Sequence, residues 1–390
     1  MSDDFCIYRN APLLRYYRSL TSLYNDRFRP IHLGIVFFVI VSLSLTIFTT
    51  VTEYELGEET SFCTNNLYLS YWCNISWSIS IIFIFPFVIG LTLKYYDEIP
   101  LLFSTLAEKI TEEQKSELDI FYQRLDFWCN SYFIALLIFL FVTYGNYCLY
   151  YFQILNEPVR ESWIANSENT FGFLYEPFNK FSRIGLYASL IQLFLIYWVA
   201  QLVYKSIVVG IFLYSFFNLH KFNIELDPLH HDGLCGLSII GRVTRVFNYI
   251  LFLLGIYISL KVIDKIIVSG NSLMDDIGNP IFLTLYIFLA PLLFFLPLAA
   301  AHNRMTEMKQ NFIKPYYKKL SSELRNADNA STIDYNRAVT LQVLIEKWQK
   351  TITVWPFNMR SIETFIAIVI IPFVPTVLAA VFDFIFQNAT

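Results

Sequence analysis

Apolar residues gather along this chain into seven long stretches that are separated by polar segments. A bilayer core is about 30 Å thick and is crossed by about 20 residues of helix, a length that each stretch reaches. The stretches are residues 31–51, 74–93, 131–152, 184–219, 243–268, 280–300 and 361–384. The pattern therefore predicts an all-α fold, a polytopic membrane helical bundle of about seven transmembrane helices.

Charged residues between the stretches predict which side of the membrane each loop faces. Five arginines precede the first stretch: Arg9, Arg15, Arg18, Arg27 and Arg29. The loop after that stretch carries Glu53, Glu55, Glu58 and Glu59 and has no Lys or Arg over residues 52–73. Lys and Arg are again frequent in residues 301–360. The positive-inside rule then places the N-terminus and residues 301–360 inside, and a seventh crossing leaves the C-terminus outside.

We expect residues 1–390 to form a single membrane domain. Its parts are a basic cytoplasmic arm (1–30), six transmembrane helices (31–300), a cytoplasmic helical segment (301–360) and the last transmembrane helix (361–384). The composition, 56% hydrophobic and 15% charged with a mean hydropathy of +0.48, exceeds what a soluble domain tolerates. Because the basic residues follow topology, we expect the bilayer and other copies of the chain as partners, and no nucleic acid. The location predicted is the cell membrane, plasma or inner.

The fourth stretch is too long for one crossing, since its roughly 36 residues would rise about 54 Å as a helix. Lys205 marks the point where this helix should meet the inner interface, and its ammonium can extend to lipid headgroups there. Residues 206–219 remain apolar beyond that point, so we expect other parts of the protein to bury them. The alternative is a helical hairpin broken near residues 204–206, which would reverse every later assignment.

Two amphipathic segments are candidates for this cover. Beyond residue 300, the sixth helix continues with Met305, Met308 and Phe312 at helical spacing. Residues 335–350 form a second amphipathic helix whose apolar face is Ala338, Leu341, Leu344, Ile345 and Trp348. We predict a cytoplasmic helical base built from this helix and from extensions of spans four to six. A contact between subunits would bury the same faces, and the second helix could instead lie on the membrane surface.

Two of the six cysteines, Cys63 and Cys73, fall in the first external loop. In an oxidising compartment this pair can form a disulfide that closes the loop. Two unpaired thiols are the alternative, because only geometry decides whether a bridge can form.

The densest group of potentially reactive side chains lies near residue 230. It comprises His220, Asp227, His230, His231 and Asp232. Such groups can hold a metal ion, contact a ligand or titrate near neutral pH, but their spacing matches no familiar zinc pattern. The competing interpretation is a tight connection, in which Asp227-Pro228 opens a turn, Gly233 and Gly236 adopt unusual φ angles, and Asp232 caps the next helix. We therefore expect no cofactor unless this loop binds a metal.

Residues 227–237, with the sequence DPLHHDGLCGL, resemble the H-P-D-G/R-x-G-G-L loop of uncharacterised bacterial multi-pass membrane proteins. Those proteins similarly carry Trp-Pro-Phe before a final span, as here at residues 355–357. His231 stands where that pattern has proline, and Cys235 where it has glycine. This family has no established activity, so the resemblance implies no functional residue.

The layout of the chain, rather than any motif, resembles that of insect chemoreceptor channels. Those proteins have seven spans, an internal N-terminus, an external C-terminus and a cytoplasmic anchor, and their last span lines a tetrameric pore. Independently of this analogy, the last span has few charges and offers Ser361, Thr364 and Thr376 as a polar stripe that can line a pore, and Pro372 and Pro375 can kink it.

Three classes of function remain open. A homo-oligomeric ion channel fits the few charges within the spans and is the function that we favour. A metal-dependent membrane enzyme would use the loop of His230 and Asp232. A transporter or a scaffold is the remaining class, although a coupled carrier usually keeps an ionisable group near the bilayer midplane.

Overall fold

The computed structural model describes residues 30–56, 79–156, 183–218, 222, 224, 226–228, 230, 232–263, 278–326, 332–356, 366 and 370. Its helices are α2 (Pro30–Leu56), the π-helical turn η2 (Ser80–Ile84), α4 (Phe85–Ala107), the 3-10 turn η3 (Glu112–Gln114), α5 (Lys115–Asn130), α6 (Tyr132–Asn156), α7 (Arg183–Asn218), α8 (Ser238–Ile263), α9 (Gly278–Asn326) and α10 (Thr332–Thr351). Over these ranges there is no strand, only an isolated bridge between Ile110 and Ile224. The all-α prediction is confirmed.

Five helical segments of the described chain are long and apolar enough to cross a membrane. They are Ser80–Ala107, Lys115–Cys148, Leu190–Asn218, Ser238–Ile263 and Leu283–Arg325, and α2 adds a shorter apolar segment at His32–Ser44. These segments are those of a multi-pass membrane protein. The seventh predicted stretch, residues 361–384, lies outside the described residues except for Ile366 and Ile370.

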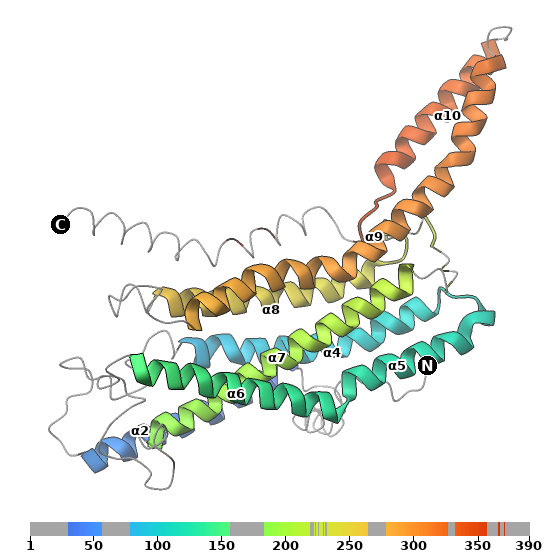
Figure 1. Ribbon diagram of the computed structural model, residues 1–390. Coiled ribbons are helices and arrows are strands. Elements are labelled where there is room, and N and C mark those ends of the chain that lie inside the picture. The colour runs from blue at the N-terminus through green and yellow to red at the C-terminus, as the bar shows by residue number, and fades with distance from the viewer. Residues whose placement is uncertain are drawn as a thin grey trace, which may run out of the picture.

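Six helices form the body of the molecule. In Figure 1, α2, α4, α6, α7, α8 and the first half of α9 run alongside one another, with packing of α2 on α4, α4 on α8, and α7 on α9. Beyond one end of this bundle lie α5 and a hairpin made of the second half of α9 and α10. We call that end the base: α5, the adjoining turns of α4, α7 and α8, and the described residues of 222–237.

Burial differs between the faces of the helices. Large apolar side chains point outward along α2 and α6, as at Ile40, Phe133 and Phe141, the last of which is 78% exposed. In the base, Leu102, Phe103 and Leu106 of α4 are fully buried, whereas Phe127 and Trp128 of α5 are 66% and 48% exposed. Outward apolar faces of this kind are expected where lipid surrounds the helices.

The long helix α7 runs unbroken from Arg183 to Asn218, which excludes the hairpin alternative at residues 204–206. One face of its second half is buried as expected, with Leu213 and Phe216 at most 2% exposed, whereas Ile211 and Tyr214 on the other face are 49% and 44% exposed. Part of the cover was not anticipated, because Phe121 of α5 contacts the ring of Phe212 at a centroid distance of 5.0 Å. Helix α9 also packs closely on α7, since a Cβ at Gly210 would lie 2.9 Å from the Leu296 side chain.

The expectation for Lys205 was wrong. Its side chain is only 2% exposed, and its ammonium lies 5.3 Å from the centre of the Tyr96 ring on α4. The ammonium therefore points into the protein instead of extending to lipid headgroups. An aromatic face offers partial compensation for the water that a buried ammonium loses.

The two amphipathic helices of residues 301–360 form as predicted. Helix α9 continues through Pro315 to Asn326, and Met305 on its apolar face is fully buried. Helix α10 spans Thr332–Thr351 and turns Ala338 and Ile345 onto α9. Trp348 of α10 joins the helices by contacting the rings of Phe312 and Tyr316 at centroid distances of 5.3 and 4.6 Å.

Candidate functional site

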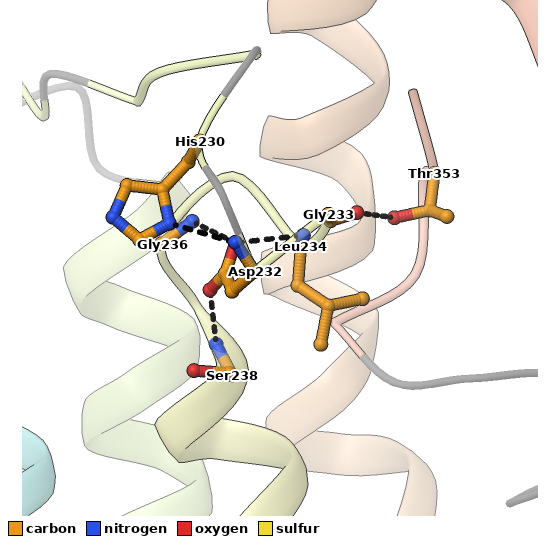
Figure 2. A network of polar contacts seen from close by, with 7 residues as sticks. All are labelled: His230, Asp232, Gly233, Leu234, Gly236, Ser238 and Thr353. Carbon is orange, nitrogen blue, oxygen red and sulfur yellow. Dashed lines mark hydrogen bonds and ion pairs between the residues drawn. The ribbon is translucent and has the colours of Figure 1, made fainter. Parts of the chain in front are cut away.

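The loop before α8 is organised around the carboxylate of Asp232. Its Oδ1 accepts hydrogen bonds from the backbone N–H groups of Leu234 at 2.8 Å and Gly236 at 3.0 Å, and its Oδ2 accepts one from Ser238 at 3.3 Å (Figure 2). The first N–H groups of a helix have no partner within the helix, and a carboxylate that precedes them supplies one. Asp232 therefore holds the loop and the first residue of α8 together.

Backbone conformation explains why the loop contains two glycines. Gly233 and Gly236 have φ angles of +65° and +78°, in the left-handed region that glycine adopts without steric cost. The predicted unusual φ angles at both positions are confirmed. Cys235 has a φ angle of +56° as well, a conformation that is strained for a side chain of this kind and that the sequence did not indicate.

The start of the loop is also a turn, as the Asp227-Pro228 pair predicts. The N–H of His230 donates to the carbonyl of Asp227 at 3.2 Å, which closes a four-residue turn. This turn brings Nδ1 of His230 to 2.9 Å from Oδ1 of Asp232. The imidazole and the carboxylate thus form one pair at the rim of the loop.

Two groups of the loop have shifted pKa values. Burial raises the pKa of Asp232, but the hydrogen bonds from Gly236, Leu234, His230 and Ser238 outweigh it and leave a pKa of about 2. Burial, followed by the nearby Asp232 and Asp227 carboxylates, raises the pKa of Cys235 to about 11. Near neutral pH Asp232 is therefore ionised, and Cys235 is a neutral thiol of low nucleophilicity.

A segment from the far end of the described chain lies against this loop. The hydroxyl of Thr353 donates a hydrogen bond to the carbonyl of Gly233 at 2.8 Å, across 120 residues of sequence (Figure 2). Two residues later, the ring of Trp355 stacks on the imidazole of His302, with centroids 3.9 Å apart and planes inclined by 20°. Nδ1 of His302 lies 2.7 Å from the carbonyl oxygen of Val354, so this nitrogen carries the proton.

Helix α9 fixes the same segment with a lysine. The ammonium of Lys309 donates to the carbonyls of Gln349 at 2.6 Å and Ile352 at 2.8 Å, at the C-terminal end of α10. These carbonyls have no partner within the helix, and a cation there also complements the helix dipole. We call the group of Gly233, His302, Lys309, Thr353, Val354 and Trp355 the latch.

The latch consists of hydrogen bonds and one ring contact between distant parts of the chain. It ties residues 352–356 to α9 on one side and to the loop before α8 on the other. Hydrogen bonds from the backbone occupy the Asp232 carboxylate, so this group is unsuited to act as a general base in the arrangement seen here. What the site can do is transmit displacement among α8, α9 and the chain that leads to residues 361–384.

The predicted metal site is only partly within the described chain. Asp227, His230 and Asp232 are described, whereas His220 and His231 are not. The described positions include no group of three or more His, Cys, Asp or Glu side chains placed to hold a metal ion. Binding of a metal by the complete set stays a prediction.

Other predicted residues lie outside the described chain: Cys63 and Cys73 of the disulfide candidate, and Ser361, Thr364 and Thr376 of the polar stripe. Sequence reasoning missed Lys309 and Thr353, the two residues that donate to the latch carbonyls. Their partners are 40 to 120 residues away along the chain. No local pattern in the sequence could have identified these contacts, because their partners lie far along the chain.

We compared the chain with known proteins. A scan of protein-family models, a search of curated proteins and a search of solved structures found no match.

Proposed function

We propose that this chain is the subunit of a homo-oligomeric ion channel of the plasma or inner membrane, with residues 361–384 as the helix that lines a shared pore. The observation that carries the proposal is the latch. It fixes residues 352–356, so the chain leaves a rigid anchor five residues before that stretch begins. The base and the hairpin face the cytoplasm, as the distribution of Lys and Arg favours.

A pore-lining helix needs a fixed point against which it can move. Helix α9 offers one, because its 49 residues form one continuous helix, about 73 Å along its axis, that joins the bundle to the hairpin. The last stretch itself contains Pro372 and Pro375, where a helix bends most readily. Movement of the loop before α8 would then reach the pore helix through Thr353 and its bond to Gly233.

The residues of the polar stripe are the groups that would contact a permeating ion. Ser361, Thr364 and Thr376 have hydroxyl groups, and the stretch between residues 364 and 376 contains no charged residue. Hydroxyl groups around a shared axis replace part of the hydration shell of a permeating ion without trapping it. A single copy of the stretch cannot enclose a pathway, so the function requires several copies.

Single-channel recording of the purified chain in planar bilayers tests this proposal. We expect Thr364→Ala and Thr376→Ala to change the unitary conductance, because they remove hydroxyl groups from the conduction path. Thr143→Ala is the matched control, since the Thr143 hydroxyl is exposed on α6 and bonds only within its own helix in the described chain. A strictly monomeric protein in native mass spectrometry, or conductance unchanged by both variants, would contradict the shared pore.

A further inference from the structure

The seam between α4 and α8 carries a cluster of charges at one level of the bundle. Three contacts show how these helices lie. The ring centroids of Phe85 and Tyr257 are 5.1 Å apart, and those of Tyr95 and Phe247 are 5.3 Å apart. The third contact is the ion pair between Oε2 of Glu98 and Nη1 of Arg242 at 4.0 Å. Residue numbers rise along α4 as they fall along α8, so the helices are antiparallel. One turn from the Glu98–Arg242 pair toward the bundle centre, Lys94 of α4 therefore lies level with Arg245 of α8.

Both of these cations are exposed and without partners in the described part of the chain. The side chains of Lys94 and Arg245 are exposed, and neither forms a hydrogen bond or an ion pair with a described residue. The Arg242 side chain is 60% exposed and, among the described residues, pairs with Glu98 at 4.0 Å. Asp97, beside Glu98 on α4, is an exposed carboxylate, whereas the Glu98 side chain is only 16% exposed. Among the described residues of the patch, three cations against two carboxylates leave an excess of positive charge.

An apolar surface continues from the patch toward the bundle centre. Tyr249, one turn beyond Arg245 on α8, is 47% exposed; Phe87 of α4 and Phe83 of the preceding turn η2 are 47% and 58% exposed. Between Arg245 and Lys261, helix α8 has no charged residue over about 24 Å, close to the thickness of a bilayer core. The cations therefore lie where this uncharged segment ends, at the level of lipid headgroups.

We propose that Lys94, Arg245 and Arg242 bind the phosphate of an anionic phospholipid in the leaflet next to the base, with its acyl chains along Phe83, Phe87 and Tyr249. Charge complementarity selects an anionic headgroup, and the adjoining apolar side chains select a lipid over a soluble phosphate. Glu98 orients Arg242, and Asp97 weakens the site. The proposal rests on membrane embedding and is independent of channel activity.

Lipid retention in native mass spectrometry tests the site. The purified full chain is titrated with phosphatidylglycerol and, separately, with phosphatidylcholine of the same acyl chains. We expect the parent protein to prefer phosphatidylglycerol. Loss of one cation near a membrane surface weakens such binding about fivefold, so Lys94→Gln with Arg245→Gln should weaken it about 25-fold. Asp97→Asn should strengthen it.

Matched variants separate this site from general charge effects. Lys318→Gln with Lys319→Gln removes the same charge from exposed positions on α9, outside the patch, and should leave lipid retention unchanged. Lys94→Arg with Arg245→Lys keeps both charges and should retain the lipid. Equal loss in the two glutamine pairs, or no preference between the two lipids, overturns the proposal. Glycerol phosphate competing as well as the lipid would also overturn it, because a soluble anion would then suffice. None of these measurements requires an ionic current.

Discussion

At the scale of single residues, Asp232 is the side chain on which the loop before α8 depends most. Its carboxylate provides the partner for three backbone N–H groups. We expect Asp232→Ala to lower the free energy of unfolding by about 2 kcal/mol, at the upper end of the range for helix caps. Asp232→Asn, which retains an oxygen acceptor, should cost about half as much. Thermal unfolding of the purified protein in detergent measures both effects.

The pH dependence of the same variants checks that the charge is responsible. The pKa of Asp232 is lowered from 3.8 to about 2, so the carboxylate favours the folded state above pH 3.8. This contribution disappears as the pH falls toward 2. The stability difference between the parent and Asp232→Asn should therefore be constant above pH 5 and shrink below pH 4. A difference that grows on acidification would contradict this account of the loop.

The residue types of the loop predicted its conformation, but they did not predict that Lys205 is buried. The Asp-Pro turn, the two glycines and the capping role of Asp232 follow from local preferences, and local geometry is what they determine. Lys205 shows the opposite case. Its environment depends on Tyr96, which lies more than a hundred positions earlier in the chain, and nothing near Lys205 in the sequence reveals an inward-facing ammonium.

At the scale of elements, Lys309 connects α9 with the end of α10. Replacing it by Met keeps most of the side-chain volume but removes both hydrogen bonds to the carbonyls of Gln349 and Ile352. Hydrogen bonds from a charged donor contribute about 1.5–3 kcal/mol each, so the end of α10 should open more readily. Hydrogen exchange followed by mass spectrometry should show faster exchange over residues 345–352 in Lys309→Met.

A second lysine on the same helix provides the control for this prediction. Lys314 is exposed and forms no hydrogen bond or ion pair with any described residue, so Lys314→Met should leave exchange over residues 345–352 unchanged. If both variants exchange alike, apolar packing around Trp348 holds α10 in place, and Lys309 does not fasten the latch.

Periodicity predicted helices well and predicted their neighbours poorly. The bounds of α7 and α10 differ from the expected ranges by only a few residues, because a 3.6-residue pattern records which face is apolar. The missed element is α5, whose Leu118, Tyr122 and Leu125 are buried. Its charged and polar residues lower the mean hydropathy of the segment, so the apolar face is not apparent from the sequence. The packing of α5 on α7 is a tertiary contact, and the sequence pattern of one helix does not determine which other helix it packs against.

At the scale of the whole molecule, two solvents explain the distribution of apolar side chains. In the base, water favours tight packing, as at Ile99 and Leu237, neither of which is exposed. Between helices in lipid this driving force is absent, so side chains such as Phe141 and Phe288 can remain on the surface of a single copy. The composition predicted membrane embedding for this reason, but it could not predict that the base would bury Lys205.

The number of crossings decides whether the last stretch can line a pore. With seven crossings the termini lie on opposite faces, and a tag between α9 and α10, at residues 327–331, lies on the same face as the N-terminus. In intact cells, antibodies should therefore reach a tag placed after Thr390, and should reach tags at the other two positions only after permeabilisation. If the tags at the two ends are accessible under the same conditions, the number of crossings is even. Residues 361–384 would then have no assigned crossing, and a pore built from Thr364 and Thr376 would lose its basis, whereas the lipid site at Lys94 and Arg245 would not.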